Sequence, residues 1–332
     1  MSNALKVSWT EDPDDGLVPA AAELATAYWR EAVGKDEPGY PVSELAWELK
    51  PAPGVVSGRL GVAHCAGEAF GAVLQRFPAQ KQRPSWLAWL VVGRQHRRQG
   101  VGWALLREAV CRAAEDGRAR LQWRSPRPSS AATSFSAAVG AKQGASLEQN
   151  RLATADMRRL PSGAWLEQAT EPIDGYELVG WDGPCPLDLV GEFAALQRVM
   201  EGAPGVNSGD TVLVTRADVR AAEHRWLPRG PYWRLCARQV ATGDLVGFTE
   251  LQLPAAQPWR ADQGDTGVLL DHRGLGLGKW LKATNARRLL EERPEVRFVE
   301  TWNASENSPM LAINQAMGFR TVARWYRWEL VL

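Results

Sequence analysis

Residues 97–102 read RRQGVG and residues 273–278 read RGLGLG, so the pattern Arg-x-x-Gly-x-Gly occurs twice in the chain. Each copy lies between an apolar, strand-like run and a helical pattern. The runs are 86–92 and 266–270, and the helical patterns are 103–114 and 279–290. Glycines let backbone N–H groups approach an anion closely, and the positive end of the following helix dipole faces it. The sequence therefore predicts two phosphate-binding turns.

The spacing of the two copies indicates a duplicated domain. The motif arginines, Arg97 and Arg273, lie 176 residues apart, about half of the 332-residue chain. A solenoid would repeat at a far shorter period. A chain of this length favours two domains, and its 45% hydrophobic content is enough for ordinary cores. We expect an N-terminal domain over 1–160, a linker over 161–175, rich in proline, glycine and acidic residues, and a C-terminal domain over 176–332.

Further residues connect both copies to a known family. A valine stands five residues before each arginine, at Val92 and Val268, and a helix-end signature follows about forty residues later, at 135–141 (FSAAVGA) and 313–319 (INQAMGF). This arrangement resembles the GNAT superfamily of N-acetyltransferases, and its duplication is similar to mycothiol synthase-like enzymes. The resemblance implies an α/β fold with two tandem domains, each a central, mostly antiparallel, splayed sheet flanked by helices.

The resemblance also implies a co-substrate, acetyl-CoA or another acyl-CoA, with its pyrophosphate on the glycine turn and its pantetheine arm along the preceding strand. In the second half, the residues expected at the cofactor are Val268, Leu269, Leu270, Arg273, Gly274, Leu275, Gly276, Leu277, Gly278, Lys279, Asn303, Asn307 and Asn314. In the first half, they are Val92, Arg97, Arg98, Gly100 and Gly102.

Acetyl transfer to an amine needs a base that removes a proton from the ammonium. Carboxylates on the central strands of the second half are the candidates, in the order Glu250, Glu300, Asp265. The resemblance also implies a tyrosine four residues before the glycine of the helix-end signature, as proton donor to the departing thiolate. The chain departs from the family there, with Asn314 in the second half and Ser136 in the first. Either the thiolate leaves unaided or another residue serves.

The two halves match the family unequally. The second half has the fuller set of motifs, including Asn303, Asn307 and the closing Gly318-Phe319. The first half has Ala141 in place of that phenylalanine and lacks the asparagine pair. We therefore expect catalysis in the C-terminal domain, with an N-terminal domain that is degenerate for chemistry but still able to bind cofactor or a polyanion.

Composition narrows the classes of site, location and partner that the sequence allows. The four cysteines are scattered without a Cys-x-x-Cys pair, which argues against a zinc or dithiol site. No apolar run approaches the roughly 18 residues of a membrane span, and the first residues lack a signal-peptide pattern. We expect a cytoplasmic enzyme, a monomer or homodimer, with no metal and no membrane partner. Its acceptor is expected to be a small-molecule amine, a metabolite or an antibiotic-like compound.

Two other functions remain open. Between Arg76 and Arg127 the chain has twelve Lys and Arg against three acidic residues. Such a stretch is either an ordinary solvated surface with a phosphate site or a docking face for a carrier protein or tRNA that delivers the acyl or aminoacyl group. The missing tyrosines also leave open a regulatory module that binds acyl-CoA without turnover.

Overall fold

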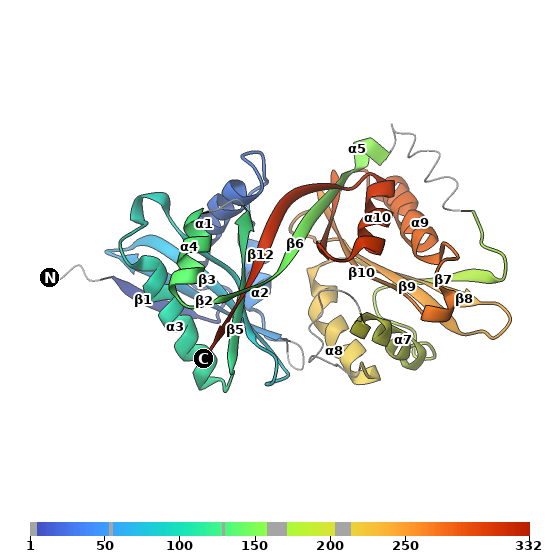
Figure 1. Cartoon of the computed structure of the whole chain (residues 1–332), viewed down its shortest axis with the longest axis horizontal. Helices are drawn as coiled ribbons and strands as arrows, with labels where there is room; N and C mark the ends of the chain where they lie inside the picture. The colour runs from blue at the N-terminus through green and yellow to red at the C-terminus, as the bar shows by residue number, and fades with distance from the viewer. Residues whose placement is uncertain (1–4, 53–55, 128–129, 158–170, 203–213) are drawn as a thin grey trace. The chain divides into compact units, whose positions relative to one another are not determined.

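The two Arg-x-x-Gly-x-Gly turns lie in two separate compact units (Figure 1). The computed structural model describes residues 5–52, 56–127, 130–157, 171–202 and 214–332. Unit 1 consists of Met1–Ser146 and Ala323–Leu332, and unit 2 consists of Leu147–Val322. Most of the expected linker, 161–170, lies outside the described residues.

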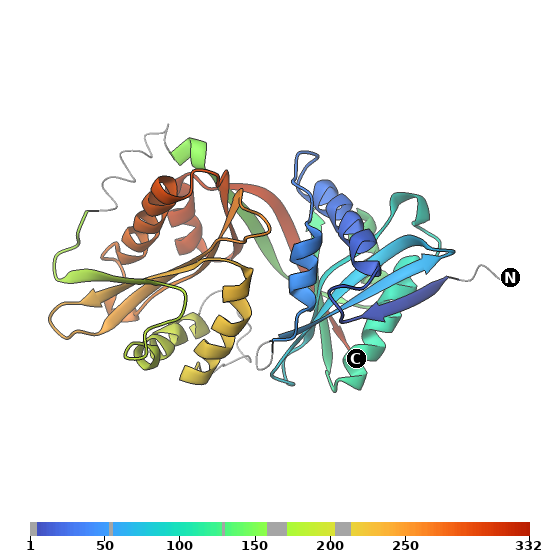
Figure 2. The same ribbon diagram turned by 180° about the vertical axis from the view of Figure 1, so that it is seen from behind.

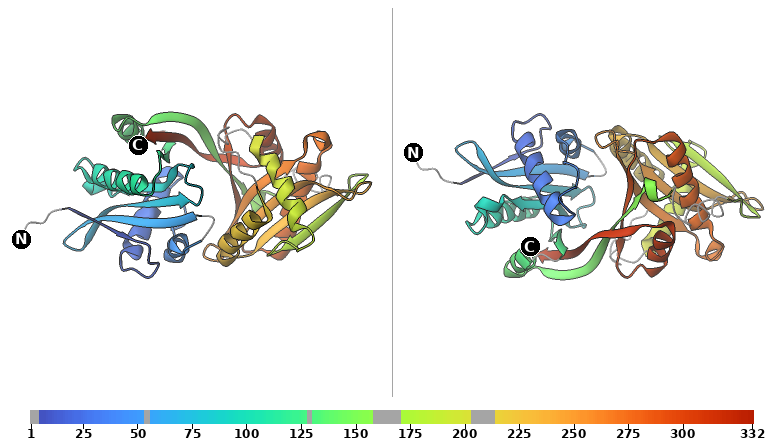
Figure 3. Two further views of the ribbon diagram at one scale, coloured as in Figure 1. Left: turned by 90° about the horizontal axis from the view of Figure 1, so that it is seen from below. Right: turned by 90° about the horizontal axis from the view of Figure 1, so that it is seen from above.

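Unit 1 is a mixed sheet with helices on both faces. Its strands, in spatial order, are β1 (Lys6–Thr10), β2 (Val56–Cys65), β3 (Glu68–Pro78), β4 (Ser85–Val92), β5 (Arg120–Arg127) and β12 (Arg320–Val331). Its helices are α1 (Leu17–Ala32), α2 (Val42–Leu49), α3 (Val101–Glu115) and α4 (Ser130–Ala138). Helices α1 and α3 lie on opposite faces of the sheet (Figure 3).

Unit 2 repeats this plan. Its strands, in spatial order, are β6 (Lys142–Ala153), β11 (Phe298–Ala304), β10 (Arg260–Val268), β9 (Leu245–Gln252), β8 (Tyr232–Gln239) and β7 (Tyr176–Asp182). Its helices are α5 (Thr154–Met157), α7 (Val190–Gln197), α8 (Arg216–Trp226), α9 (Leu277–Glu292) and α10 (Ser308–Met317). Helices α7 and α8 cover one face, and α9 and α10 cover the other (Figures 1 and 2).

The units do not coincide with the two consecutive domains expected from the sequence. The last strand of the chain, β12, pairs antiparallel with β5 and so belongs to unit 1. The second part of β6, from Leu147, pairs antiparallel with β11 and belongs to unit 2. Each sheet thus takes a border strand from the other half of the chain. The alternating pattern of a strand does not indicate which strand it pairs with.

Both sheets open beside the strand that leads to the glycine turn. Strand β4 pairs parallel with β5 only over Ser85–Leu87, and β10 pairs parallel with β11 only over Arg260–Asp262. Each of these strands also has a one-residue bulge against its other neighbour, at Leu87/Trp89 in β4 and between Gln263 and Thr266 in β10. A bulge re-aims side chains and ends regular pairing. The expected splayed sheets are therefore present in both units.

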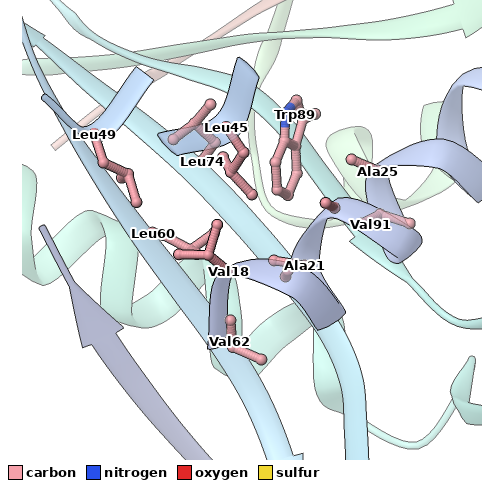
Figure 4. Packing of buried hydrophobic residues seen from close by; sticks show 12 residues of the cluster. Val18, Ala21, Ala25, Leu45, Leu49, Leu60, Val62, Leu74, Trp89 and Val91 are labelled. Carbon is pink, nitrogen blue, oxygen red and sulfur yellow. The ribbon is translucent and has the colours of Figure 1, made fainter. Parts of the chain in front are cut away.

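The bulge in β4 sends neighbouring large side chains to opposite faces. Leu87 packs in the cluster under α3, whereas Trp89, two residues later, packs with Ala21 and Leu45 under α1 and α2 (Figure 4). Residues two apart in a regular strand share a face, so the extra residue accounts for the switch. Because of this bulge, β4 contributes side chains to the hydrophobic clusters on both faces of the sheet, just before the glycine turn.

Local sequence signals account for most boundaries. A hairpin turn at Thr242-Gly243-Asp244 joins β8 to β9, with Gly243 at φ 79°. Thr215 is the N-cap of helix α8, and Asp218 completes a capping box with it. In the described part of the chain, no helix is both long and apolar enough to cross a membrane.

Candidate functional site

The two glycine turns have the same backbone conformation. Gly100 and Gly276 cap α3 and α9 in the left-handed region, at φ 83° and 86°. Two residues earlier, Gly274 has φ 80°, and its counterpart Arg98 adopts φ 64° without being glycine. A non-glycine residue pays a steric penalty in this region, about 1–3 kcal/mol. Unit 1 therefore keeps a cation at a position where the backbone would favour glycine.

The motif arginine closes the turn in each unit. The Nε of Arg97 donates to the carbonyl of Val92 at 3.1 Å, and the Nε of Arg273 donates to the carbonyl of Val268 at 2.9 Å. This contact explains why a valine stands five residues before each arginine. In both units it joins the end of the strand to the turn, so the arginine has a structural role besides any contact with an anion.

The first turns of α3 and α9 leave backbone donors available. No side chain caps the N-terminus of either helix in the described structure. The first N–H groups of a helix lack intrahelical partners, and the helix dipole adds partial positive charge there. Both helix starts therefore suit a phosphate, as the sequence predicts.

A cavity of about 590 Å³ opens from the turn of unit 1 into the space between β4 and β5. All five residues expected at the cofactor in the first half line it, namely Val92, Arg97, Arg98, Gly100 and Gly102. Its inner wall is apolar, with Leu90, Leu106, Trp123 and Phe135 among the lining residues. Ligand pockets of small molecules measure roughly 300–1,000 Å³ and combine apolar walls with a few polar groups. The cavity has this character.

Sequence reasoning missed other groups that line this cavity. Glu31 of α1 binds Arg97 through both carboxylate oxygens, at 3.1 and 2.8 Å, and also contacts Arg94 at 3.5 Å. These arginines lower the pKa of Glu31, so it stays charged and is a poor base. Tyr28, Trp103 and Arg124 line the same cavity. No local pattern could reveal α1, which lies about seventy residues before the turn.

Tyr28 is the titratable hydroxyl of the unit 1 cavity. Burial raises the pKa of Tyr28 well above its usual value, although the charge of Arg124 partly opposes the shift. The Tyr28 ring contacts Trp29 edge-to-face at 5.4 Å and lies 6.1 Å from Trp325. A phenol with such a pKa keeps its proton at neutral pH and acts as a hydrogen-bond donor.

Ser136 stands where the family places a tyrosine, and it has a structural partner. Its hydroxyl accepts a hydrogen bond from the indole of Trp123 at 2.9 Å, and both residues are buried. Both line the cavity as well. The small serine therefore leaves room in the cavity while it fixes the tryptophan on its wall.

In unit 2 the corresponding side chains bind one another. Lys282 donates to Asn314 Oδ1 at 2.5 Å, and Asn314 Nδ2 donates to Asn303 Oδ1 at 2.8 Å. Asn150 also donates to Asn303, at 3.3 Å. Lys282 is buried, and this burial lowers its pKa to about 7. It stands nine residues after its motif arginine, as the cavity-lining Leu106 does in unit 1. In unit 2, hydrogen-bonded polar side chains thus occupy the position that apolar side chains occupy in the cavity of unit 1.

The other cofactor residues expected in unit 2 have varied surroundings. Asn307 is the N-cap of α10 and accepts from the backbone of Met310 at 3.3 Å. Strand β10 ends at Val268, so Leu269 and Leu270 lie beyond the strand that was expected to hold the pantetheine arm. Leu277 is buried in the core. The exposed residues of the turn and helix start are Arg273, Gly274, Leu275, Gly276 and Lys279, and Gly278 is partly buried.

Glu250 and Asp265 lie near the bulge of β10, but their surroundings differ. Glu250 is buried and accepts from Arg234 Nε at 3.0 Å, and Arg234 also binds Glu223 at 3.2 Å. Asp265 is an exposed residue that no cation pairs with among the described residues. Local desolvation and the negative charge of Glu250 raise the pKa of Asp265 to about 6. Of these two, Asp265 is better suited to accept a proton near neutral pH.

Glu300 is held by strand β6. Its carboxylate accepts from Arg151 Nη2 at 2.6 Å and from Gln149 at 2.8 Å, and Arg260 approaches to 3.3 Å. The side chain is buried. Two arginines and an amide therefore occupy this carboxylate. This environment suits an ion pair that joins β6, β10 and β11 rather than a base.

The basic stretch of unit 1 is partly neutralised by ion pairs. Eight of its twelve cations form ion pairs with acidic side chains, namely Arg76, Lys81, Arg94, Arg97, Arg107, Arg112, Arg118 and Arg120. Three of the acids that pair with these cations lie outside the stretch from Arg76 to Arg127, namely Glu31, Glu48 and Glu329. The eight cations share five carboxylates, because Glu31, Glu108 and Asp116 each pair with two of them, so the stretch keeps an excess of positive charge and the polyanion-binding alternative stays open. In the described residues, no group of three or more His, Cys, Asp or Glu is placed to hold a metal ion.

Comparisons with known proteins agree with the fold. Residues 19–136 match the Acetyltransferase (GNAT) family. The chain is similar to a tandem GNAT protein from the clavulanic acid biosynthesis pathway, solved without AcCoA, with 26% identity over 99% of this chain and 98% of that chain and a TM-score of 0.81. A GCN5-related N-acetyltransferase from Sphaerobacter thermophilus has the same fold, with 18% identity over 100% and 96% of the two chains and a TM-score of 0.69. No curated protein matches the sequence.

The family match and the structural similarity cover different extents. The match at 19–136 begins in α1 and ends in α4, and it includes the turn and most of the residues that line the unit 1 cavity. The similarity to the tandem GNAT protein extends over both units. Residues 19–136 therefore resemble a GNAT acetyltransferase domain, and the chain as a whole has the fold of a tandem GNAT protein.

Proposed function

We propose that this protein is an acyl-CoA-dependent N-acyltransferase whose acyl donor binds in the unit 1 cavity and whose acceptor is a small-molecule amine. The observation that carries the proposal is the cavity itself, which joins the glycine turn to the gap between β4 and β5. The family match to this segment supports acyl transfer. Acetyl is the simplest acyl group for the donor.

The residues of the cavity fit the parts of such a donor. The N–H groups at the start of α3 and the guanidinium of Arg98 would bind the pyrophosphate, because both present positive charge at the turn. The unpaired edge of β4 after Leu87 offers backbone groups to the amides of the pantetheine arm. The apolar wall around Leu106 and Trp123 would exclude water from the thioester.

The reaction would then proceed by direct transfer. The neutral amine attacks the thioester carbonyl carbon, the C–N bond forms, the C–S bond breaks, and the sulfur leaves as a thiolate. The Tyr28 hydroxyl would donate a hydrogen bond to the developing negative charge. It would stabilise the thiolate more than protonate it, because its pKa lies above that of a thiol, about 8.5. The acceptor ammonium would first lose a proton to water to give the neutral amine, and the nitrogen would lose its second proton to water after the C–N bond forms, since Glu31 is held by arginines.

The sequence prediction that unit 2 is the catalytic domain remains a competing proposal. Asp265 is the base that its surroundings favour, and the turn at 273–278 retains an uncapped helix start. The chain from Lys282 through Asn314 to Asn303 argues against it, because these groups satisfy one another where a ligand would lie. A cytoplasmic location remains an expectation from the sequence.

The direct test is titration calorimetry of CoA and acetyl-CoA, followed by thiol release with a panel of small amines. Arg98→Gly is the informative variant, because the equivalent residue in unit 2 is Gly274 in the same backbone conformation. It removes a cation without straining the turn. We expect wild type to bind CoA and Arg98→Gly to bind it several-fold more weakly, about 1 kcal/mol for one exposed charge. Binding without thiol release for any amine would favour a non-catalytic acyl-CoA module.

A further inference from the structure

An unusually exposed tryptophan stands at the mouth of the unit 1 cavity. Trp103 is 54% exposed, and it is the one tryptophan among the exposed large hydrophobic residues of the described chain. It lies three residues after the Gly100 cap, about 4.5 Å along the helix axis at 1.5 Å per residue. Because Trp103 also lines the cavity, a ligand that enters the cavity can cover this indole.

The orientation of Trp103 is fixed by a neighbour. Its ring contacts Phe135 of α4 edge-to-face, with centroids 6.1 Å apart and planes at 75°. Both residues line the cavity. Aromatic pairs of this geometry hold each other in place, so Trp103 presents a rigid surface beside the turn.

The chemistry around Trp103 selects the kind of ligand. Arg97 and Arg98 line the same cavity, and the first turn of α3 has free N–H donors. A flat apolar surface next to a phosphate site is suited to a nucleotide, because every base has a face that stacks on an aromatic ring. A phosphopantetheine group carried by a protein has the phosphate but no base.

We propose that Trp103 is a stacking surface for the adenine of a free coenzyme A donor, and that it selects this donor over a protein-bound phosphopantetheine. This inference rests on the proposed function and narrows its donor. The equivalent position of unit 2 is Lys279, six residues after its motif arginine as Trp103 is in unit 1. Unit 2 therefore has a flexible cation, and not an indole, at this position of its helix.

The test compares ligands that share parts of CoA. Wild type, Trp103→Ala and Trp103→Phe are titrated with CoA, adenosine 3′,5′-bisphosphate and 4′-phosphopantetheine, and Lys279→Ala is the matched control in unit 2. Trp103→Ala should weaken CoA and the bisphosphate by about fivefold or more, the lower range for loss of one base–aromatic stack. It should leave 4′-phosphopantetheine within about twofold, and Trp103→Phe should retain most of the affinity for CoA.

Two results would overturn the inference in distinguishable ways. If Trp103→Ala weakens CoA and 4′-phosphopantetheine equally, or weakens neither, while wild type binds CoA, then stacking is wrong and the proposed function stands. If wild type binds neither CoA nor 4′-phosphopantetheine, the proposed function itself fails, and the inference fails with it. Denaturant unfolding of Trp103→Ala shows whether the variant is folded, as expected for an exposed side chain.

Discussion

Two residues of the unit 1 cavity, Ser136 and Tyr28, bear on the role that the family gives to one tyrosine. Ser136 stands at the family position but is committed to Trp123, whereas Tyr28 reaches the same cavity from α1. Burial keeps the Tyr28 hydroxyl protonated at neutral pH. In the proposed mechanism the proton-bearing group therefore lies on another helix, which a motif at fixed spacing cannot reveal.

Replacing Tyr28 by phenylalanine tests this role. The change keeps the ring that contacts Trp29 and Trp325 and removes only the hydroxyl. Because loss of one donor to a developing negative charge typically costs about 10²–10³ in kcat, we expect a large fall in kcat with little change in KM for acyl-CoA. Steady-state kinetics of thiol release measure both. An unchanged kcat would rule out Tyr28 as the donor.

Lys282 should make stability depend on pH in a defined direction. Burial lowers its pKa to about 7 in the folded state, against about 10.4 for an unperturbed lysine. Between these values the unfolded state binds more protons, so folding stability from this group rises with pH. We expect Lys282→Met to gain stability relative to wild type at and below pH 7, and this gain should shrink as the pH rises toward 10.

Urea unfolding of both proteins at several pH values measures that difference. The variant also leaves Asn314 without its donor, a cost that does not vary with pH in this range. The prediction therefore concerns how the stability difference between variant and wild type changes with pH, and not its absolute size. A stability difference that stays constant from pH 6.5 to 9.5 would show that the amine is not desolvated.

At the scale of elements, the bulges in β4 and β10 determine which face of the sheet the neighbouring side chains lie on. In β4 the bulge separates Leu87 from Trp89, and in β10 it lies where Asp265 approaches Glu250. An alternating pattern predicts a strand but does not show where one extra residue shifts its faces. The sequence therefore predicted both strands and both turns, and could not predict which carboxylates are paired.

Asp265→Asn tests the electrostatics of the β10 bulge. Desolvation and Glu250 raise the pKa of Asp265 to about 6, so the folded state binds a proton more tightly than the unfolded chain, whose pKa is about 3.9. Stability from this group is therefore lost as the pH rises through that window. We expect Asp265→Asn to be stabilised relative to wild type at pH 7 and not at pH 4.

Thermal or denaturant unfolding at the two pH values checks this expectation. Asp262, on the same strand, is a matched control, because Arg229 and Arg260 lower its pKa instead. Asp262→Asn should lose stability at pH 7. Equal effects of both substitutions would contradict the assigned environments.

At the scale of the whole molecule, each sheet is completed by the other half of the chain. Duplication could be predicted from the two turns, because backbone geometry at a glycine turn is local. The strand exchange could not be predicted, because β12 and β6 have no local feature that names β5 or β11 as a partner. Asn303 and Asn314, which the resemblance places at the cofactor, contact each other, and Asn314 also contacts Lys282.

Removal of residues 323–332 tests the assignment of β12 to unit 1. Trp325 and Trp328 are both buried there. Loss of a buried tryptophan side chain costs about 3–5 kcal/mol, so loss of both removes much of the roughly 5–15 kcal/mol that stabilises a domain. We expect hydrogen exchange to show lost protection in β4 and β5 and retained protection in β8 and β9. Removal of Leu332 alone is the control, and equal loss in both units would contradict the assignment.

The most direct measurement is calorimetric titration of CoA into Gly102→Ala and Gly278→Ala. Each change adds a methyl at the same position of α3 or α9, where its nearest neighbours lie at 3.5 Å and 3.8 Å, ordinary contact distances. Both variants should fold, but the methyl of Gly102→Ala faces Val92 and Phe135 on the cavity wall. We predict that Gly102→Ala weakens CoA by about tenfold or more, equivalent to about 1.4 kcal/mol, while Gly278→Ala binds as wild type does. Loss of binding in Gly278→Ala, with Gly102→Ala unaffected, would contradict a donor site in unit 1.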